Sequence, residues 1–377
     1  MSIPYIDLKA QYMRLKPEID AGIQRVLDHG KFILGPEVGE FEAALAAHVG
    51  VSHVVSCANG TDALILALMA ENIGAGDAVF IPSFTFTATA ETVLLVGAEP
   101  VFVDVNSKNF LIDGDDLERK IAAVEAAGRL TPRAVIPVDL FGLPADYEAL
   151  LKIAGAHDLF LLADAAQSMG ARYRRRAVGS LAPATVSSFF PAKPLGCYGD
   201  GGALLTDDTA RAEMWRSLRG HGTGKAKYDV VRIGMNSRLD TIQAAVLLAK
   251  LPGFAAEIEA RERVAEYYDR HLPAAVTRPG RRADSDSAWA QYTIQVANRD
   301  GLAAALREVG IPTAIHYPMP MHLQPAYRGY GDGPGSLPAS EKLAAHVLSL
   351  PMHPDMNQAT SRRICQEIEQ HLEAHGA

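Results

Sequence analysis

The feature that most constrains the fold is a series of short apolar runs that do not alternate with polar residues. Three of these runs are 101–105, 134–138 and 159–163. Strands that are buried on both faces have this pattern. Stretches with helical patterns, such as 63–69 and 87–96, also lie in this part of the chain. Strands that alternate with helices predict an α/β fold built on an open, mostly parallel sheet.

The pattern changes after Asn236. The elements expected beyond it are helical segments in 239–272, 302–308 and 362–373 and a strand at 292–296. The first of these segments is interrupted at Pro252–Gly253. A chain of 377 residues is too long for one ordinary core. We therefore predict a large α/β domain at 1–254 and a smaller α+β domain at 255–377.

Composition excludes several classes of function. The net charge is −8 and there is no long basic run, so neither nucleic acid nor an anionic membrane is an expected partner. Cys57, Cys197 and Cys365 are too far apart for a zinc pattern or a disulfide framework, and we predict no metal site. The start of the chain has no long apolar run of a secretory signal. A cytoplasmic location is the expectation.

A lysine, Lys193, lies between an apolar run and the glycine-rich stretch 199–202. Pyridoxal phosphate (PLP) chemistry needs a lysine amine that forms a Schiff base and later moves protons. Ser188 stands five residues earlier and could reach a cofactor phosphate. On this motif alone, a solvated surface lysine is the commoner interpretation.

A second candidate follows the apolar run 161–163, which ends in Asp164. In open α/β sheets, ligands bind beyond the carboxyl ends of the strands. A carboxylate there can keep a pyridinium nitrogen protonated, which preserves the ring as an electron sink. Gln167, three residues later, could hydrogen-bond a ring oxygen. The alternative is that Asp164 only caps a helix.

A third candidate is the small-residue turn 56–60, which leads from a strand into a helix. The N-terminus of a helix offers free N–H groups and a positive dipole end to phosphate. Gly60 permits close approach of the backbone, and the Thr61 hydroxyl adds a donor. By itself the turn is equally consistent with an ordinary capped helix.

Together these motifs supply a phosphate site, a ring-nitrogen partner and a Schiff-base lysine in this chain order. The order of these motifs and their amino-acid sequences resemble those of the DegT/DnrJ/StrS family of sugar aminotransferases. The resemblance extends from Ile6-Asp7-Leu8 to the stretch 349–354, and it includes Ser188 before Lys193 and the stretch 236–239. It implies the fold-type I architecture of PLP-dependent transferases, which is aspartate aminotransferase-like, and a homodimer.

The resemblance also implies roles for residues around the cofactor ring. Lys193 matches the Schiff-base lysine, Asp164 the pyridinium partner and Gln167 the residue beside the ring hydroxyl. Phe86 matches an aromatic residue that stacks on the ring, and stacking suits an electron-poor pyridinium. Without the resemblance, Phe86 would be interpreted as ordinary core.

Other residues match the family's phosphate site. Gly60, Thr61 and Ser188 correspond to the phosphate cup. Asn236 matches a residue that reaches the phosphate from the other subunit, which implies active sites shared across the dimer.

Within the family, the sequence at 56–64, 188–203 and 316–320 most resembles that of aminotransferases that act on UDP-2-acetamido-2-deoxy-3-oxo-glucuronate. These enzymes take an amino group from L-glutamate in bacterial surface-polysaccharide pathways that supply O-antigen and lipopolysaccharide. Asp139 departs from the His or Ser that relatives often have. This departure leaves the expected chemistry unchanged.

Three residues are candidates for the substrate site. Arg238 could pair with the carboxylate of a uronate or of glutamate through two parallel hydrogen bonds. The alternative is that Arg238 is a surface arginine at a helix terminus. Enzymes that act on uncharged 6-deoxy sugars have a similar sequence here, so Arg238 does not decide between the substrates. His316 and Tyr317 could line the sugar or nucleotide site, or form a structural pair at a strand end.

Three other functions compete with this interpretation. One is a dTDP-linked 3-keto- or 4-keto-6-deoxyhexose as substrate. Another is a dehydratase of the same family, in which histidine replaces the lysine, and Lys193 argues against it. The last is a non-catalytic regulator, which the complete set of Asp164, Gln167, Ser188 and Lys193 disfavours.

Overall fold

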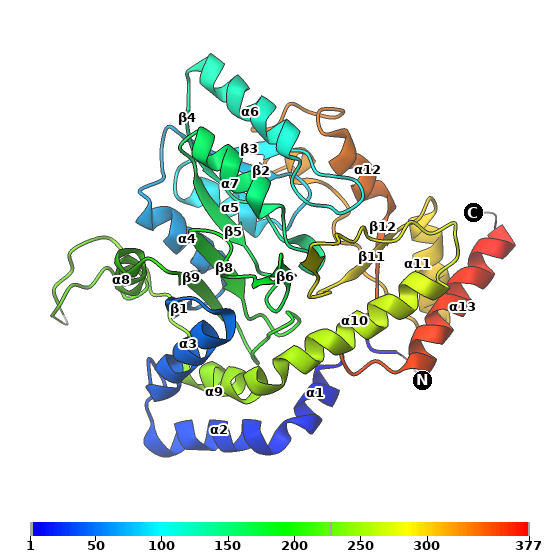
Figure 1. The fold of residues 1–377 in the computed structure, drawn as a ribbon, viewed down its shortest axis with the longest axis horizontal. Helices are drawn as coiled ribbons and strands as arrows, with labels where there is room; N and C mark the ends of the chain where they lie inside the picture. The colour runs from blue at the N-terminus through cyan, green and yellow to red at the C-terminus, as the bar shows by residue number, and fades with distance from the viewer. Residues whose placement is uncertain (1–2, 227, 376–377) are drawn as a thin grey trace.

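The computed structural model describes residues 3–226 and 228–375, and a seven-stranded sheet lies at the centre of the larger part (Figure 1). The strand order is β1-β9-β8-β5-β4-β2-β3. The strands are β1 (His53–Cys57), β2 (Asp77–Pro82), β3 (Glu99–Val103), β4 (Thr131–Val135), β5 (Phe160–Asp164), β8 (Ala184–Ser188) and β9 (Gly202–Thr206). Only β9 runs against its neighbours, so the sheet is mostly parallel, as predicted.

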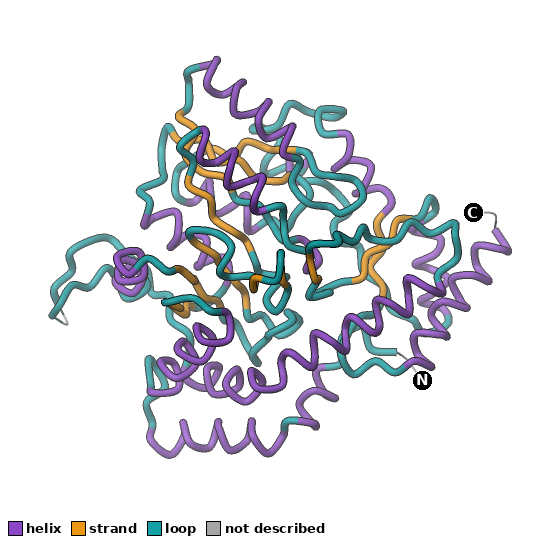
Figure 2. Tube along the Cα trace, viewed as in Figure 1, coloured by secondary structure: helices purple, strands orange, loops and turns teal. Residues whose placement is uncertain are grey.

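Helices enclose this sheet on both faces (Figure 2). They include α3 (Pro36–Val49), α4 (Gly60–Ala70), α5 (Ala88–Leu95), α6 (Gly114–Ala127), α7 (Tyr147–Ala156) and α8 (Thr209–Leu218). Helix α2 (Lys16–His29) instead packs on the later helix α9 (Thr241–Lys250). Along β2, Val79 and Ile81 belong to the core under α4 and α5, whereas Ala78 and Phe80 belong to the core under α6 and α7. Successive side chains of a strand point to opposite faces. The absence of alternation in the sequence therefore reflects burial on both faces.

Two predicted strands are displaced toward the N-terminus. β3 and β4 end at Val103 and Val135, although the apolar runs continue to Val105 and Val138. The extra residues are apolar because Val105 and Val138 pack in a separate core cluster with Phe84 after the strands have ended.

The C-terminal part has its own core. Its elements are α10 (Phe254–His271), β11 (Tyr292–Gln295), α11 (Arg299–Glu308), η3 (Met321–Leu323), α12 (Pro338–His346), β12 (Val347–Leu350) and α13 (Gln358–His375). Before it come α9 (Thr241–Lys250) and the 3-10 turn η2 (Leu251–Gly253), which pack in a core with α3, β1 and β9. One cluster joins α10, α11, α13 and both strands, and it includes Ile3 from the start of the chain. Met321, Tyr327 and Leu337 instead pack into the core of the large sheet. The boundary at 254/255 remains our proposal.

Some short elements complete the chain. They are α1 (Leu8–Arg14), β6 (Arg172–Tyr173), β7 (Arg176–Ala177), the 3-10 turn η1 (Leu140–Gly142) and β10 (Ser285–Asp286). One segment within the helical stretch Thr241–His271 is long and apolar enough to cross a membrane, with a mean hydropathy of 1.3, but half of that segment is buried inside the structure. The N-terminal part of the stretch, α9, packs on α2 and α3. This packing accounts for its apolar character.

Candidate active site

Asp164 is the last residue of β5, at the carboxyl end of the parallel sheet. Its carboxylate is buried and accepts hydrogen bonds from the Thr89 hydroxyl at 3.2 Å and the Ala166 N–H at 3.1 Å. Burial raises the pKa of this carboxyl group, and the Ala166 N–H, the positive charge of Lys193 and the Thr89 hydroxyl oppose that rise. A cation in contact with Asp164 would offset the cost of burying its charge.

Lys193 lies in the turn that follows β8, where its backbone N–H donates to the Phe190 carbonyl at 2.8 Å. Burial lowers the pKa of the Lys193 amine, and the negative charge of Asp164 opposes this effect. The structure therefore brings the predicted lysine and carboxylate into one electrostatic site. A lowered pKa favours the neutral amine, which is the form that attacks a carbonyl and accepts a proton.

The Gln167 side chain has a fixed orientation. Its amide oxygen accepts the Phe141 N–H at 2.7 Å, so the amide NH₂ remains as a donor. Burial raises the pKa of the Tyr317 hydroxyl, and a hydrogen bond from Gln167 opposes this rise. Gln167 and Tyr317 are therefore neighbours, although 150 positions separate them in the sequence.

His316 also belongs to this site. Its Nδ1 lies 3.0 Å from the Ser349 hydroxyl oxygen. Burial, with the positive charge of Lys193, lowers the pKa of His316 to about 4, so the imidazole is neutral at pH 7. The structure thus brings His316 into electrostatic contact with Lys193, and Tyr317 beside Gln167.

The predicted phosphate cup forms where α4 begins beside the end of β8. Asn59 caps α4 by accepting the Asp62 N–H at 2.8 Å, and Gly60 is the first residue of the helix. A Cβ atom on Gly60 would lie 2.8 Å from the Ser188 Cβ atom, so only glycine fits against Ser188 here. The first-turn N–H groups of a helix lack partners within the helix. With the hydroxyls of Thr61 and Ser188, these groups make an anion site.

Phe86 is exposed, with 53% of its surface accessible, and its ring centroid lies 6.2 Å from that of Tyr317. The interpretation of Phe86 as ordinary core is therefore wrong. Single exposed apolar side chains are common at protein surfaces, so the informative feature of Phe86 is its place beside Tyr317. An exposed aromatic face beside Tyr317 is available to a flat ring.

The segment 236–238 lies next to the phosphate cup of the same chain. The Ser237 hydroxyl oxygen accepts the Ala58 N–H at 3.2 Å, and the Arg238 guanidinium donates to the Asn236 amide oxygen. Asn236 is exposed and Arg238 is half-exposed. Both side chains therefore remain accessible to a ligand or to a second subunit.

Sequence reasoning missed three contributors to this site. Thr89 binds the Asp164 carboxylate, the Phe141 N–H binds Gln167, and Asp139 binds the hydroxyl of Ser168. Thr89 lies one helical turn after Phe86, which is the only local signal among them. The other two depend on loop geometry that no short motif encodes.

These groups fit PLP. The turn at Gly60 would hold its phosphate, Phe86 and Asp164 would contact the ring face and the ring nitrogen, and Lys193 would bond the carbonyl carbon. The fold and the site therefore define a fold-type I PLP-dependent enzyme.

The chain belongs to the DegT/DnrJ/EryC1/StrS aminotransferase family, whose model matches residues 13–369. It is similar to UDP-2-acetamido-2-deoxy-3-oxo-D-glucuronate aminotransferase of Pseudomonas aeruginosa, with 47% identity over 96% of this chain and 98% of that protein. It is also similar to UDP-N-acetyl-3-dehydro-α-D-glucosamine 3-aminotransferase of Acidithiobacillus ferrooxidans, with 43% identity over 100% and 99% of the two chains. The predicted family and enzyme class are confirmed.

Solved structures agree on the fold. A DegT/DnrJ/EryC1/StrS aminotransferase from Brucella abortus is 51% identical and covers 100% of both chains with a TM-score of 0.96. NtdA from Bacillus subtilis, with the bound cofactor PMP, is 27% identical over 99% of this chain and 85% of that chain, with a TM-score of 0.88. The predicted fold class and cofactor are thereby confirmed.

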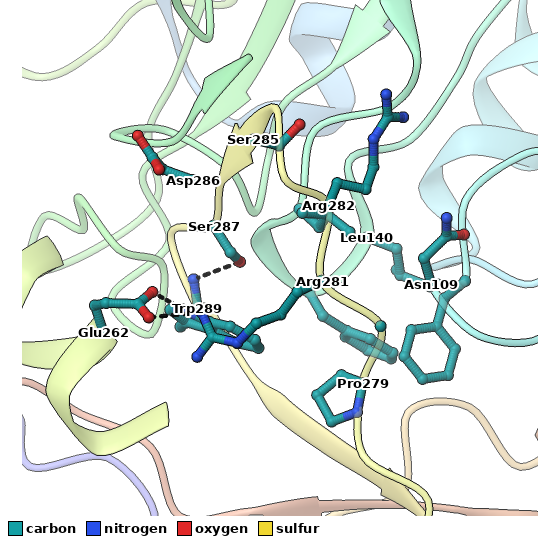
Figure 3. Close-up of a pocket in the computed structure, with 14 residues that line it drawn as sticks. Asn109, Leu140, Glu262, Pro279, Arg281, Arg282, Ser285, Asp286, Ser287 and Trp289 are labelled. Atoms are coloured by element: carbon teal, nitrogen blue, oxygen red, sulfur yellow. Dashed lines mark hydrogen bonds and ion pairs between the residues drawn. The ribbon is translucent and has the colours of Figure 1, made fainter. Parts of the chain in front are cut away.

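A separate small cavity of about 90 Å³ lies near this site and is lined by the segment 279–289 and by Phe141 (Figure 3). Its arginines are already paired. Arg281 lies over the Trp289 ring and binds Glu262 and Asp269, whereas Arg282 binds Asp146 and Asp284. The cavity therefore offers little unbalanced positive charge to an anionic ligand.

Proposed function

We propose that this enzyme converts UDP-2-acetamido-2-deoxy-3-oxo-glucuronate to its 3-amino sugar, with L-glutamate as amino donor and PLP as cofactor. The observation that carries the substrate is the 47% identity, along nearly the whole chain, to the Pseudomonas enzyme named for this reaction. The product would serve bacterial surface-polysaccharide synthesis, and the enzyme would act in the cytoplasm.

The roles of the site residues follow from their positions. PLP supplies an electron sink for negative charge that develops on the substrate carbon. Lys193 would anchor the cofactor, and its Nζ, once released, would carry the proton between reacting atoms. The Asp164 carboxylate holds a proton on the ring nitrogen, Phe86 covers the ring face, and Gln167 donates to the ring oxygen.

The remaining residues hold the ends of the bound molecules. Gly60, Thr61 and Ser188 bind the phosphate through backbone N–H and hydroxyl groups. We propose that Arg238 pairs with the sugar carboxylate, since a guanidinium can make two parallel hydrogen bonds to it. His316, held neutral, and Tyr317 would line the sugar.

We propose a homodimer with shared active sites. The stretches 221–226 and 228–235 project from the body of the protein beside α8 (Figure 1). Their apolar side chains are exposed: Tyr228 by 87%, Val230 by 62%, Val231 by 51% and Ile233 by 84%. An apolar arm of this kind is typical of a protein interface. Asn236 directly follows the arm, so a dimer built on it would bring Asn236 to the interface.

The test is transfer of ¹⁵N from labelled L-glutamate to UDP- and dTDP-linked keto sugars, with products identified by mass spectrometry. We expect label in the 3-amino sugar from the UDP-linked uronate, at the highest kcat/KM of the panel. A preference for a dTDP-linked 6-deoxy sugar would reject the proposed substrate and retain the class of enzyme. Absence of transfer to every sugar would reject both.

A further inference from the structure

Asp139 is a completely buried carboxylate that the reaction described above does not use. One of its oxygens accepts the Ala145 N–H and the Tyr147 hydroxyl, both at 2.8 Å, and the other accepts the Ser168 hydroxyl at 2.6 Å. A buried carboxylate is costly unless donors replace its water. These donors make that replacement, so the site is built around the carboxylate.

The donors lie on two separate segments. Ala145 and Tyr147 lie at the start of α7, whereas Ser168 directly follows Gln167. The carboxylate therefore ties the loop 139–147 to the segment that carries Gln167. Between the tied points, Phe141 donates its N–H to the Gln167 amide oxygen at 2.7 Å.

The same loop is joined to the end of β5. The Asp139 N–H donates to the Asp164 carbonyl at 3.0 Å, and the Asp164 N–H donates to the Pro137 carbonyl at 2.9 Å. Phe141 has a φ of +61°, a conformation that a non-glycine residue keeps only where its surroundings hold it. The Ala288 N–H donates to the Gly142 carbonyl at 2.9 Å and the Gln291 N–H donates to the Phe141 carbonyl at 3.4 Å, so both also hold this part of the loop. The Asp139 carboxylate is the side-chain anchor that ties the loop to Ser168.

We propose that Asp139 is a positioning residue: its carboxylate closes the loop 139–147 onto Ser168, and this sets the Phe141 N–H that orients the Gln167 side chain. The inference rests on the proposed function, because there Gln167 contacts the cofactor. The titratable groups that face the carboxylate are Tyr147 and Asp164, and burial raises the pKa of Asp139 to about 7.

The test is a double-mutant cycle with Asp139→Ala, Gln167→Ala and the double variant. The readouts are the Kd of PLP for the apoenzyme and the pH midpoint of the visible absorbance of the holoenzyme. Misplacing a contacting group costs up to about a hundredfold, so we expect each single variant to weaken PLP by roughly tenfold. The Kd of PLP for the double variant should be within about twofold of the Kd for the single variant that binds PLP less tightly, because both changes remove the same interaction. Additive losses, or a midpoint that moves in Gln167→Ala but not in Asp139→Ala, would overturn the proposal.

Conservative variants separate position from charge. Asp139→Asn keeps the shape and one acceptor, and the Ser168 hydroxyl can reverse to accept from the new amide. We expect its PLP affinity to be within about threefold of wild type. A loss as large as that of Asp139→Ala would show that the charge matters and contradict positioning. If Asp139→Ala does not fold, Ser168→Ala takes its place in the cycle, since it removes only the bond to the Gln167 segment.

Asp116 provides a matched control. It is also a buried carboxylate, it accepts the Asp104 N–H at 2.6 Å, and it lies on α6. Asp116→Ala should lower Tm and leave PLP affinity unchanged. If Asp116→Ala weakened PLP as much as Asp139→Ala does, the effect of Asp139→Ala would be explained by lost stability alone. Failure of the wild-type protein to bind PLP would reject the proposed function itself. Additivity in a protein that binds PLP rejects only the role of Asp139.

Discussion

Asp164 illustrates how burial and chemistry are linked at the scale of single residues. Two neutral donors and the charge of Lys193 act on its carboxylate, but burial still raises its pKa. A cation in direct contact would oppose this rise, and a protonated ring nitrogen is such a cation. A bound pyridinium would restore the charged form of Asp164.

Asp164→Asn tests this role. An amide cannot hold the proton on the ring nitrogen, so we expect kcat to fall by roughly 10³-fold, while PLP still binds through Lys193 and the phosphate cup. Steady-state kinetics and the visible spectrum measure the two effects separately. Asp116→Asn, at a buried carboxylate outside the site, should retain turnover. Near-normal turnover of Asp164→Asn would assign the role to another acid.

Arg238 is tested by comparing two substrates. A charged, paired hydrogen bond is worth about 1.5–3 kcal/mol, so Arg238→Ala should lower kcat/KM for the uronate by roughly ten- to a hundredfold. The loss should be much smaller for the analogue with a hydroxymethyl group at C6. Arg238→Lys should recover part of the loss, since lysine lacks the planar fork. Equal losses on both sugars would mean that Arg238 serves the cofactor, the donor or the dimer.

The sequence predicted the site residues that lie in local motifs, such as Lys193 and Gly60. It did not predict Thr89 or Phe141, because their partners lie 75 and 26 residues away in the chain. Such contacts depend on how loops meet at the edge of the sheet. The family resemblance identified Phe86 as a ring-stacking residue, whereas its residue type alone indicated core, since an isolated aromatic residue is more often buried.

At the scale of elements, apolar patterns predicted most helices and strands but misplaced some ends. A long periodic helix such as α13 (Gln358–His375) has a strong signal. The strands β3 and β4 end before their apolar runs do, because loop residues such as Val138 are also buried. Hydrophobicity reports burial, and burial does not stop where a strand stops.

The junction of α4 and β8 gives an element-scale prediction. Gly60→Ala would place a methyl group 2.8 Å from the Ser188 Cβ atom, so one element must shift. We expect PLP affinity to fall by about tenfold, equivalent to roughly 1.4 kcal/mol. Gly39→Ala, in an open position on α3, should leave PLP affinity unchanged and stabilise the protein by about 0.5–1 kcal/mol. Equilibrium titration of both apoenzymes with PLP measures the difference, and equal affinities would reject the close contact at Gly60.

At the scale of the whole molecule, the projecting arm formed by residues 221–226 and 228–235 is the feature that a monomer explains least. Its exposed apolar residues lie just before Asn236, which is itself exposed. The adjacent Ser237 binds Ala58 of its own chain. Either the same chain or a partner could therefore receive the Asn236 side chain, and the shared site is a prediction from family resemblance.

Mixed dimers distinguish these arrangements. Lys193→Ala and Asn236→Ala chains, each inactive alone, should regain activity when mixed, because one site of the mixed dimer then has both intact residues. After full exchange between equal amounts of the two chains, roughly half of the dimers should be mixed, as expected for a closed two-fold dimer. Because each mixed dimer has one intact site of two, the activity per chain should be about a quarter of that of the wild type. No recovery, with subunit exchange shown by mass spectrometry, would place Asn236 in the site of its own chain.

The most direct test of the central claim is to locate the lysine that bonds the cofactor. The wild-type holoenzyme would be reduced with borohydride, digested and mapped by mass spectrometry, beside Lys193→Ala and a control, Lys250→Arg. We expect the pyridoxyl group on Lys193 alone, no label in Lys193→Ala, and unchanged labelling in the control, since Lys250 donates to the Gly196 carbonyl away from Asp164. Label on any other lysine of the wild-type protein, or persistent labelling of Lys193→Ala, would contradict the site described here.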